Sequence, residues 1–278
     1  IGRDARVTEK LIGLGANPDD YEIHNSAQSP LVAKMVDRLY NRLQRRGYLR
    51  RDIQRMVNRD RNIFGALLLQ MDQADAMITG VTRTFSQTLR ELRRVLDPKK
   101  DAVPFGIHVM VGKTHTVFIA DTTVNERPTA EELAHIAEKT AAVARRMGHV
   151  PRVAFLSFST FGNPAGTWLN NIRDAVALLD VRRPNFEYEG DMPPDVALNP
   201  ALMKNYPFCR LSGPANVLVM PGLQSANLSA KLMRELGGDQ VIGPMLLGME
   251  RQVQVATMAS STSDLVTLAV LAAAGVTE

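Results

Sequence analysis

Residues 152–163 read RVAFLSFSTFGN, a short apolar run that is followed directly by small polar residues. Three other segments share this apolar character: GIHVMV at 106–111, TVFIAD at 116–121 and NVLVMP at 216–221. Strands that are apolar on both sides are typical of parallel sheets whose two faces are covered by helices. Ligands of such sheets bind outside the carboxyl ends of the strands, so polar loops such as 157–163 are candidate sites.

Helical patterns alternate with these strands. An apolar stripe that stops before Gly47 indicates one helix. Thr129 and Glu132 form a capping-box pattern at the start of another, and Asn170 or Asn171 is the expected N-cap of a third. The sequence therefore predicts an α/β fold, in two lobes with mostly parallel sheets and a cleft between them. The expected helices cover residues 31–43, 133–148, 172–180, 225–238 and 264–275.

The C-terminal stretch VQVATMASSTSDLVTLAVLAAAG, residues 253–275, ends in an apolar helical pattern that we expect to be buried. Asp264 stands where this helix begins, behind Thr257 and the hydroxyl run 260–263. Two interpretations are open. Ser and Asp side chains at this point can cap the orphan amide groups of the helix, or they can belong to an active site.

Composition narrows the class of protein. The chain has 278 residues, of which 45% are hydrophobic, and it carries a net charge of +4. Cys209 is the single cysteine, so an internal disulfide is excluded and a cytoplasmic, reducing compartment is expected. No apolar run approaches the roughly 20 residues that cross a bilayer, so no membrane partner is expected. The first residues show neither an initiator Met nor a targeting pattern, which suggests a piece of a longer polypeptide.

Much of the positive charge lies in the segment 41–61, which holds eight arginines. A basic run can meet nucleic acid, but only Tyr48 is interleaved for base stacking, so no nucleic-acid partner is expected. A solvated helix face, an oligomer contact and a site for a phosphate-bearing ligand remain open.

Several familiar motifs are absent. Gly13 and Gly15 lie in GLGANP, where Pro18 stands in place of the third glycine of a dinucleotide-binding loop. The five histidines are scattered without metal-ligand spacing, so no metal site is expected. Ser157 and Ser159 lack the glycine pattern of a nucleophile elbow. The chemistry of the residues alone therefore names no reaction.

The order of the loops resembles that of the phosphate acetyltransferase and butyryltransferase family over nearly the whole chain. The segments that carry this resemblance are QADAMITG (73–80), TLR (88–90), VAFLSFSTFGN (153–163), EGDMPPDVA (189–197), GPANVLVMP (213–221), ANLSAKL (226–232) and VIGPMLLG (241–248). Four segments resemble more narrowly the phosphotransacetylase-like module of large bacterial malic enzymes: 42–52, 187–192, 206–221 and 235–248.

The resemblance implies two α/β lobes, one formed by residues 1–103 with 247–278 and the other by 104–246. It implies that acetyl-CoA lies in the cleft between them, where phosphate attacks the thioester in true transferases. The residues that it assigns to acetyl-CoA are Arg90, Ser157, Ser159, Thr160, Asn163, Asn227, Lys231, Thr257 and Asp264. It also implies that the first elements of the family's fold lie upstream of Ile1.

The chain departs from the family at the phosphate end of the cleft. Thr257 keeps the hydroxyl of a family serine, whereas Met258 replaces a family arginine, ahead of the position of the catalytic aspartate, Asp264. A second family arginine has no clean counterpart near Leu43 and Gln44, and Phe161 replaces a lysine. Gln224 and Ala226 replace an asparagine and a glycine. Because one preorganised charged donor is worth about 10²–10³ in rate, we expect no transacetylase activity and assign no catalytic residue.

Three functions stay open in this order. The first is a regulatory domain that binds acetyl-CoA and signals to a malic enzyme module of the same polypeptide. The second is an active phosphate acetyltransferase, with Arg42 or Arg45 replacing the lost cations. The third is an oligomerisation module that binds no ligand. The resemblance implies at least a dimer, and it places NAD(P) and Mg or Mn in the malic enzyme module, where malate is decarboxylated oxidatively to pyruvate.

Overall fold

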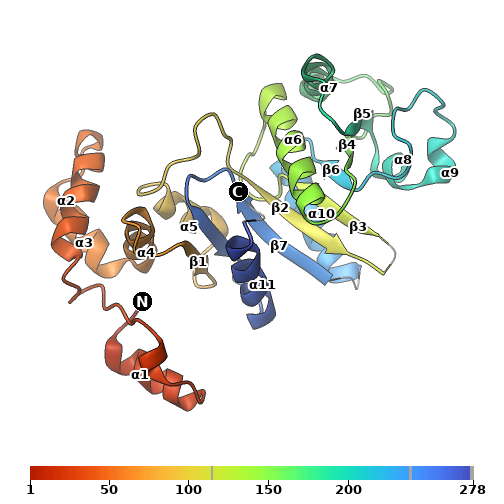
Figure 1. Ribbon diagram of the computed structural model, residues 1–278. Coiled ribbons are helices and arrows are strands. Elements are labelled where there is room, and N and C mark those ends of the chain that lie inside the picture. The colour runs from red at the N-terminus through yellow and green to blue at the C-terminus, as the bar shows by residue number, and fades with distance from the viewer. Residues whose placement is uncertain (114, 238–239, 276–278) are drawn as a thin grey trace.

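The computed structural model describes residues 1–113, 115–237 and 240–275. Within these residues, the strands form a six-stranded sheet in the order β5-β4-β6-β3-β2-β7 and a separate parallel pair, β1-β8 (Figure 1). The strands are β1 (Ala76–Gly80), β2 (Phe105–Val111), β3 (Thr116–Ala120), β4 (Arg152–Leu156), β5 (Glu187–Met192), β6 (Val217–Val219), β7 (Gln240–Leu247) and β8 (Gln252–Ala256). The chain is therefore α/β, as its sequence predicts.

Most strand pairs are parallel, but β2 runs antiparallel to both of its neighbours, β3 and β7. The sequence pattern alone suggested a parallel strand at this position. The connection from β2 to β3 covers only residues 112–115, and a parallel neighbour would need a crossover of about a dozen residues. The short connection therefore forces a hairpin.

Helices cover both faces of the six-stranded sheet. On β4, Val153 and Phe155 pack into the core under α6 (Ala130–Arg146) and α7 (Asn170–Arg182). The alternate residues, Ala154 and Leu156, pack into a core on the other face. That second core lies under α8 (Pro194–Leu198), α9 (Pro200–Met203) and α10 (Leu223–Leu236). Because neighbouring side chains of a strand point to opposite faces, burial on both faces explains the continuous apolar runs.

The β1-β8 pair has its own set of helices. These are α1 (Asp4–Gly13), α2 (Val32–Leu43), α3 (Arg50–Arg59), α4 (Arg61–Gln70), α5 (Phe85–Leu92) and α11 (Thr262–Ala273). Helices α2, α3 and α4 gather on the side of the pair that lies away from the six-stranded sheet, and α1 projects from them (Figure 1). The core that α2, α3, α4 and α5 share with β8 contains Met35, Leu39, Phe64 and Val255. The division into lobes at residues 103/104 and 246/247 stays a prediction.

The basic segment 41–61 forms the end of α2, a short 3₁₀ turn, Gln44–Arg46, and α3. Ile53 and Val57 turn the apolar side of α3 into the core. Seven of the eight arginines are exposed, and Arg42 is half-buried. The segment is thus a helix pair with a charged outer face.

Of the two helix starts that the sequence predicted from capping residues, one is confirmed and one is wrong. Thr129 and Glu132 form the predicted capping box of α6 with both hydrogen bonds present. The predicted N-cap of α7 is wrong: Leu169 takes that position and no side chain caps the helix. A 3₁₀ turn, Thr167–Leu169, runs directly into α7, so both asparagines lie inside the first turn. Among the described residues, no helix combines the length and the apolar character that crossing a membrane requires.

The C-terminal helix α11 is less buried than its sequence suggests. Only Leu268 and Ala272 are buried within the described chain, whereas Val266 and Val270 are 58% and 60% exposed. One side of the helix packs on β7 and β8, and no described segment covers the other. The expectation of a buried helix is therefore wrong for this chain by itself.

Candidate functional site between the two sheets

The site begins at the carboxyl ends of β1 and β8, which run parallel in register from Ala76↔Gln252 to Gly80↔Ala256. Gly80 has a φ of 118°, and a Cβ at this position would lie 2.1 Å from the carbonyl oxygen of Ala256. Glycine is thus required for the two strands to end this close together. Two loops, 81–84 and 257–261, leave side by side from this point and lead into α5 and α11.

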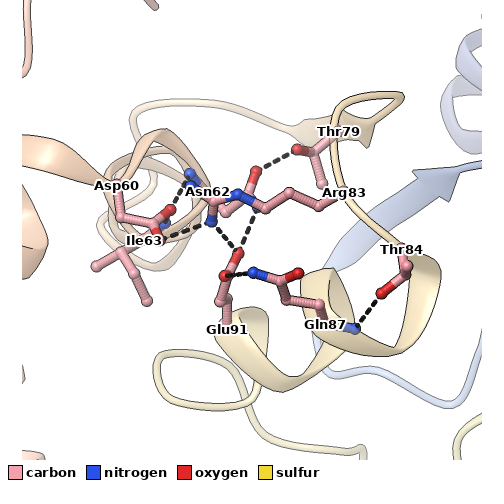
Figure 2. Close-up of polar contacts among 8 residues, drawn as sticks. All are labelled: Asp60, Asn62, Ile63, Thr79, Arg83, Thr84, Gln87 and Glu91. Atoms are coloured by element: carbon pink, nitrogen blue, oxygen red, sulfur yellow. Dashed lines mark hydrogen bonds and ion pairs between the residues drawn. The ribbon is translucent and has the colours of Figure 1, made fainter. Parts of the chain in front are cut away.

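A polar network fixes the first of these loops (Figure 2). Nη1 of Arg83 donates to Oδ2 of Asp60 at 2.8 Å and to Oε2 of Glu91 at 2.5 Å. Asn62 donates to the same Glu91 oxygen at 2.7 Å and accepts from the hydroxyl of Thr79 at 2.5 Å. These hydrogen bonds raise the pKa of Arg83 above its usual value. The network joins α4, β1 and α5, so it holds the start of α5 in place.

Thr84 is the N-cap of α5, and its hydroxyl accepts a hydrogen bond from the Gln87 amide at 3.3 Å. Arg90 lies in the last turn of the same helix and is exposed. The two acidic residues near it in the sequence, Glu91 and Asp97, are engaged elsewhere. Glu91 binds Arg83, and Asp97 forms a two-pronged ion pair with Arg42, at 2.7 and 2.5 Å. Within the described chain, the Arg90 guanidinium has no recorded partner.

A cavity of about 720 Å³ lies between the start of α5 and the start of α10. Helix α10 follows β6, so the cavity sits at the carboxyl edge of the six-stranded sheet, where α/β sheets bind ligands. Of the residues that sequence analysis assigned to a ligand, Asn227 lines this cavity, and its amide nitrogen donates to the carbonyl of Thr122 at 3.1 Å. The full lining is Thr84, Phe85, Ser86, Thr123, Glu126, Arg127, Leu223, Gln224, Asn227 and Leu228.

The first turn of α11 contacts α10 near the C-terminal end of α10, beyond the part of α10 that lines the cavity. Ser261 and Asp264 form a capping box, in which the Ser261 amide donates to Oδ2 of Asp264 at 2.8 Å. Nη2 of Arg234 donates to that same oxygen at 3.2 Å. Thr257 bonds to Ser260, from its amide at 3.0 Å and between the hydroxyls at 3.1 Å. Asp264 thus caps α11, as one of the two interpretations of the sequence predicted, and it also bonds to Arg234 of α10.

Two basic residues of α10 lie between the cavity and Asp264. Lys231 is exposed and lies one turn after Asn227, and Arg234 follows. Beneath them on β2, Nδ1 of His108 lies 2.8 Å from the hydroxyl of Thr122. Burial, together with the charges of Arg234 and Lys231, lowers the pKa of His108 to about 4. His108 is therefore neutral near pH 7, and the positive field of this surface comes from α10.

Met258 lies in the loop that precedes α11, where its side chain is 61% exposed. It brings no charge to the position at which the family resemblance implies an arginine. Arg42, one of the two arginines considered as a replacement, donates to Asp97 and to the carbonyl of Arg94. Its charge is thus engaged on the far side of α5. Arg45, the other, is exposed on the 3₁₀ turn after α2.

The loop after β4, residues 157–163, lies outside the lining of this cavity. Among the described residues that line the 720 Å³ cavity, none comes from this loop. Ser157 and Ser159 are buried, and the Ser159 hydroxyl has no hydrogen-bond partner. Thr160 is half-buried and Asn163 is exposed. Phe161 packs against Tyr206 and Phe208, with ring centroids 5.2 and 4.9 Å apart.

Sequence analysis missed part of the cavity wall: Thr84 to Ser86, the segment from Thr123 to Arg127, and the Arg234 contact. The first was detectable as the N-cap of the TLR helix. The second follows β3 directly, so the rule for carboxyl ends of strands applies to it. In the described ranges, no group of three or more His, Cys, Asp or Glu side chains is placed to hold a metal ion.

Comparisons with known proteins agree on the family. The model of the family described as "Phosphate acetyl/butaryl transferase" matches residues 1–273. An NADP-dependent malic enzyme of Rhizobium meliloti is 49% identical over 275 residues, which are 98% of this chain and 36% of that protein. A phosphate acetyltransferase of Bacillus subtilis is 28% identical over 97% of this chain and 82% of its own.

Among solved structures, a phosphotransacetylase from Streptococcus pyogenes has a TM-score of 0.90 at 30% identity, over 99% of this chain and 84% of that one. The chain thus spans about 36% of the length of the malic enzyme relative and most of the length of the transacetylases.

Proposed function

The chain belongs to the phosphate acetyl/butaryl transferase family, and from this premise we propose that it binds acetyl-CoA in the 720 Å³ cleft without transferring the acetyl group. Its role is regulatory. It acts on the malic enzyme module of the polypeptide to which it belongs, by coupling the occupancy of the cleft to the activity of that module.

Acetyl transfer to phosphate makes three demands on a site. Cations must hold the phosphate, a donor must face the oxyanion that forms from the thioester, and a carboxylate must manage the thiol proton. The observation that carries this proposal is the state of Asp264. Its Oδ2 atom accepts from both the Ser261 amide and Arg234, so the carboxylate is held as a cap and as an ion-pair partner. Beside it, Met258 offers no charged donor.

The cleft retains what ligand binding needs. Its volume lies in the range of about 300–1,000 Å³ that is usual for ligand sites. Asn227 and Thr84 supply polar groups to its lining, Arg127 and Glu126 supply charged ones, and Lys231 is exposed one turn after Asn227 on α10. Cationic groups near a largely preformed cleft suit the phosphates of CoA.

The connection to malate metabolism rests on the relatives. Proteins named NADP-dependent malic enzyme match 98% of this chain with about a third of their own length. We propose that the rest of such a polypeptide decarboxylates malate oxidatively to pyruvate, with NAD(P) and Mg or Mn bound there, in the cytoplasm. Regulation then requires that acetyl-CoA bind two states of the whole enzyme with different affinities.

Self-association belongs to the same proposal. Helix α10 exposes Leu228, Leu232 and Leu236 at four-residue spacing, with exposed fractions of 56%, 58% and 80%. A stripe of this kind favours contact with a second copy, so we expect at least a dimer. Sedimentation velocity at micromolar concentration tests this, and a purely monomeric boundary contradicts it.

Calorimetry with acetyl-CoA and with free CoA tests the binding proposal on the 278-residue chain. A coupled assay of thiol release in the presence of phosphate tests for transfer on the same sample. Saturable binding with no transfer supports the proposal. Transfer at ordinary enzyme rates replaces it by an active acetyltransferase, and the lack of both replaces it by an oligomerisation module.

A further inference from the structure

A second cavity lies on the opposite face of the six-stranded sheet from α10. It has a volume of about 390 Å³ and sits where β7 ends and β2 begins, beside α6. The side chains of α6 pack into the core of one sheet face, whereas those of α10 pack into the core of the other. The sheet therefore separates this cavity from the proposed acetyl-CoA cleft, so a ligand can bind here whether or not acetyl-CoA binds there. The lining is Lys99, Lys100, Asp101, Ala102, Phe105, His135, Lys139, Arg146, Leu247 and Gly248.

The lining is strongly cationic. It brings together three lysines and Arg146, opposed by the single carboxylate of Asp101. None of the ion pairs recorded for the described residues involves the ammonium groups of Lys99, Lys100 or Lys139. Like charges gathered around one hollow repel each other and focus a positive potential in it, and an anion bound there relieves the repulsion.

The basic residues come from two sides of the cavity, the segment before β2 and helix α6. The Lys99 amide donates to the carbonyl of Gly248 at 2.9 Å, and the Ala102 amide donates to the carbonyl of Lys99 at 3.0 Å. These bonds fold the segment before β2 into a turn that carries two of the lysines. On the facing side, His135 and Lys139 are four residues apart on α6, so they share one face of that helix.

His135 completes the polar lining as a neutral donor. Its Nε2 atom accepts a weak hydrogen bond of 3.5 Å from the Val103 amide, which leaves the ring proton on Nδ1. Burial lowers the pKa of His135, and the charge of Lys139 lowers it further. The floor of the cavity is apolar, because Phe105 and Leu247 are buried there. The hollow thus offers separate positive charges at its rim and a dry base.

We propose that this second cavity binds a small, multiply charged anion of the phosphate-ester class. Lysine ammonium groups act as point charges that suit phosphate oxygens, and three of them line this cavity together with the Arg146 guanidinium. The volume suits a small metabolite better than a whole coenzyme. Inorganic pyrophosphate carries the same chemistry in its simplest form and serves as the probe.

The experiment titrates pyrophosphate into the unmodified 278-residue chain by calorimetry, at about 20 mM and about 150 mM salt. We expect saturable binding with a Kd below about 1 mM at low salt, weakening at high salt. The variant Lys99→Ala/Lys139→Ala should bind at least about tenfold more weakly. Lys34→Ala is the matched control, because Lys34 is an exposed helical lysine far from the cavity on α2.

Two outcomes overturn the proposal. One is the absence of pyrophosphate binding by the unmodified chain at millimolar concentrations. The other is equal binding by Lys99→Ala/Lys139→Ala and Lys34→Ala, which would leave only general attraction to a basic protein. A third titration, with acetyl-CoA present at saturation, checks that the sites are separate. Unchanged pyrophosphate affinity supports a second site, and full competition assigns the anion to the acetyl-CoA cleft and refutes the proposal.

Discussion

Arg234 and Asp264 join α10 to the first turn of α11 through a hydrogen bond of 3.2 Å between Nη2 and Oδ2. The two side chains are 29% and 20% exposed, so the pair is shielded from solvent more than a surface ion pair is. Helix α10 packs on the six-stranded sheet, whereas α11 packs on β1 and β8 and on the neighbouring edge strand β7, so this contact joins two helices that follow different sheets. The same Asp264 oxygen also accepts the Ser261 amide, so the carboxylate takes part both in the helix cap and in this contact between helices.

The pair should show a measurable coupling energy. In a double-mutant cycle with Arg234→Gln and Asp264→Asn, we expect about 1 kcal/mol of coupling from urea unfolding, because partial burial strengthens the ion pair. The exposed pair Arg50–Asp37 is the matched control, with side chains 58% and 57% exposed. Coupling there should be near zero, and an Arg234–Asp264 value no larger than the control would show that the contact contributes nothing.

Replacing Arg83 should be costly. Arg83→Met leaves the buried carboxylate of Glu91 and that of Asp60 without their shared cation, so we expect a loss of about 2–4 kcal/mol in the free energy of unfolding. Adding Glu91→Gln to the variant removes one uncompensated charge and should restore part of the loss. Arg93→Ala, at the exposed C-cap of α5, is the control and should change stability by less than about 0.5 kcal/mol. If the two arginine variants are equally stable, the network does not hold α5.

His108 should make stability depend on pH. Its pKa is about 4 in the folded chain and about 6.5 when unfolded, so between these values the unfolded chain binds a proton that the folded chain does not. The contribution of the neutral imidazole is fully present above pH 6.5. It is lost as pH falls toward 4, by up to about 3 kcal/mol.

The measurement compares urea unfolding of the unmodified chain and of His108→Gln at pH 7 and pH 4.5. Carboxylates titrate in both proteins, so the difference between the two isolates the histidine. We expect the variant to lose less stability on acidification. Parallel losses in the two proteins would mean that His108 titrates normally.

The sequence predicted those parts of the fold that depend on local chemistry. Thr129 and Glu132 correctly predicted the start of α6, because a capping box involves only four consecutive residues and can be recognised in the sequence. The apolar run around Phe155 correctly indicated a strand that is buried on both faces. Orientation was harder. The direction of β2 depends on the length of the connection to β3, and the uncovered side of α11 depends on what packs against it. The spacing of apolar residues along the sequence reveals neither the direction of β2 nor the exposed side of α11.

The same division holds for the site. The family motifs pointed to Asn227 and to Asp264, which lie on the cavity wall and at the helix contact. They did not reveal that Arg234 holds Asp264, because that contact joins helices thirty residues apart in the chain. They also placed Ser159 in the site, although the fold buries its side chain completely. Local motifs thus located positions, whereas the partners of those positions came from tertiary structure.

Acetyl transfer should be undetectable, and restoring one charge should not be sufficient. Met258→Arg places a guanidinium at an exposed position of the 257–261 loop, but Asp264 stays bound to Ser261 and Arg234. We expect at most a trace of phosphate-dependent thiol release from acetyl-CoA in this variant. Turnover by the unmodified chain at an ordinary rate, about 1–10³ per second, would contradict the regulatory proposal.

Arg90 should anchor acetyl-CoA. Its two candidate carboxylate partners bind other arginines, so its exposed guanidinium is available to a ligand oxygen through paired donors. Arg90→Ala should weaken acetyl-CoA binding by about 1.5–3 kcal/mol, the value of a charge-assisted hydrogen bond, with little change in melting temperature. Calorimetry measures the affinity, and Arg93→Ala, which removes an exposed arginine from the end of the same helix, is the control.

In the whole polypeptide, which we propose to be a malic enzyme, Arg90→Ala should blunt the response of malate oxidation to acetyl-CoA while basal activity stays largely intact. A global defect would instead lower both, which separates loss of the ligand from loss of the fold. If Arg90→Ala and Arg93→Ala bind acetyl-CoA as tightly as the original chain, the anchor lies elsewhere in the cleft, and Lys231 becomes the next residue to replace. If the original chain does not bind acetyl-CoA at all, the cleft has no ligand to explain it, and an oligomerisation module becomes the better account of this domain.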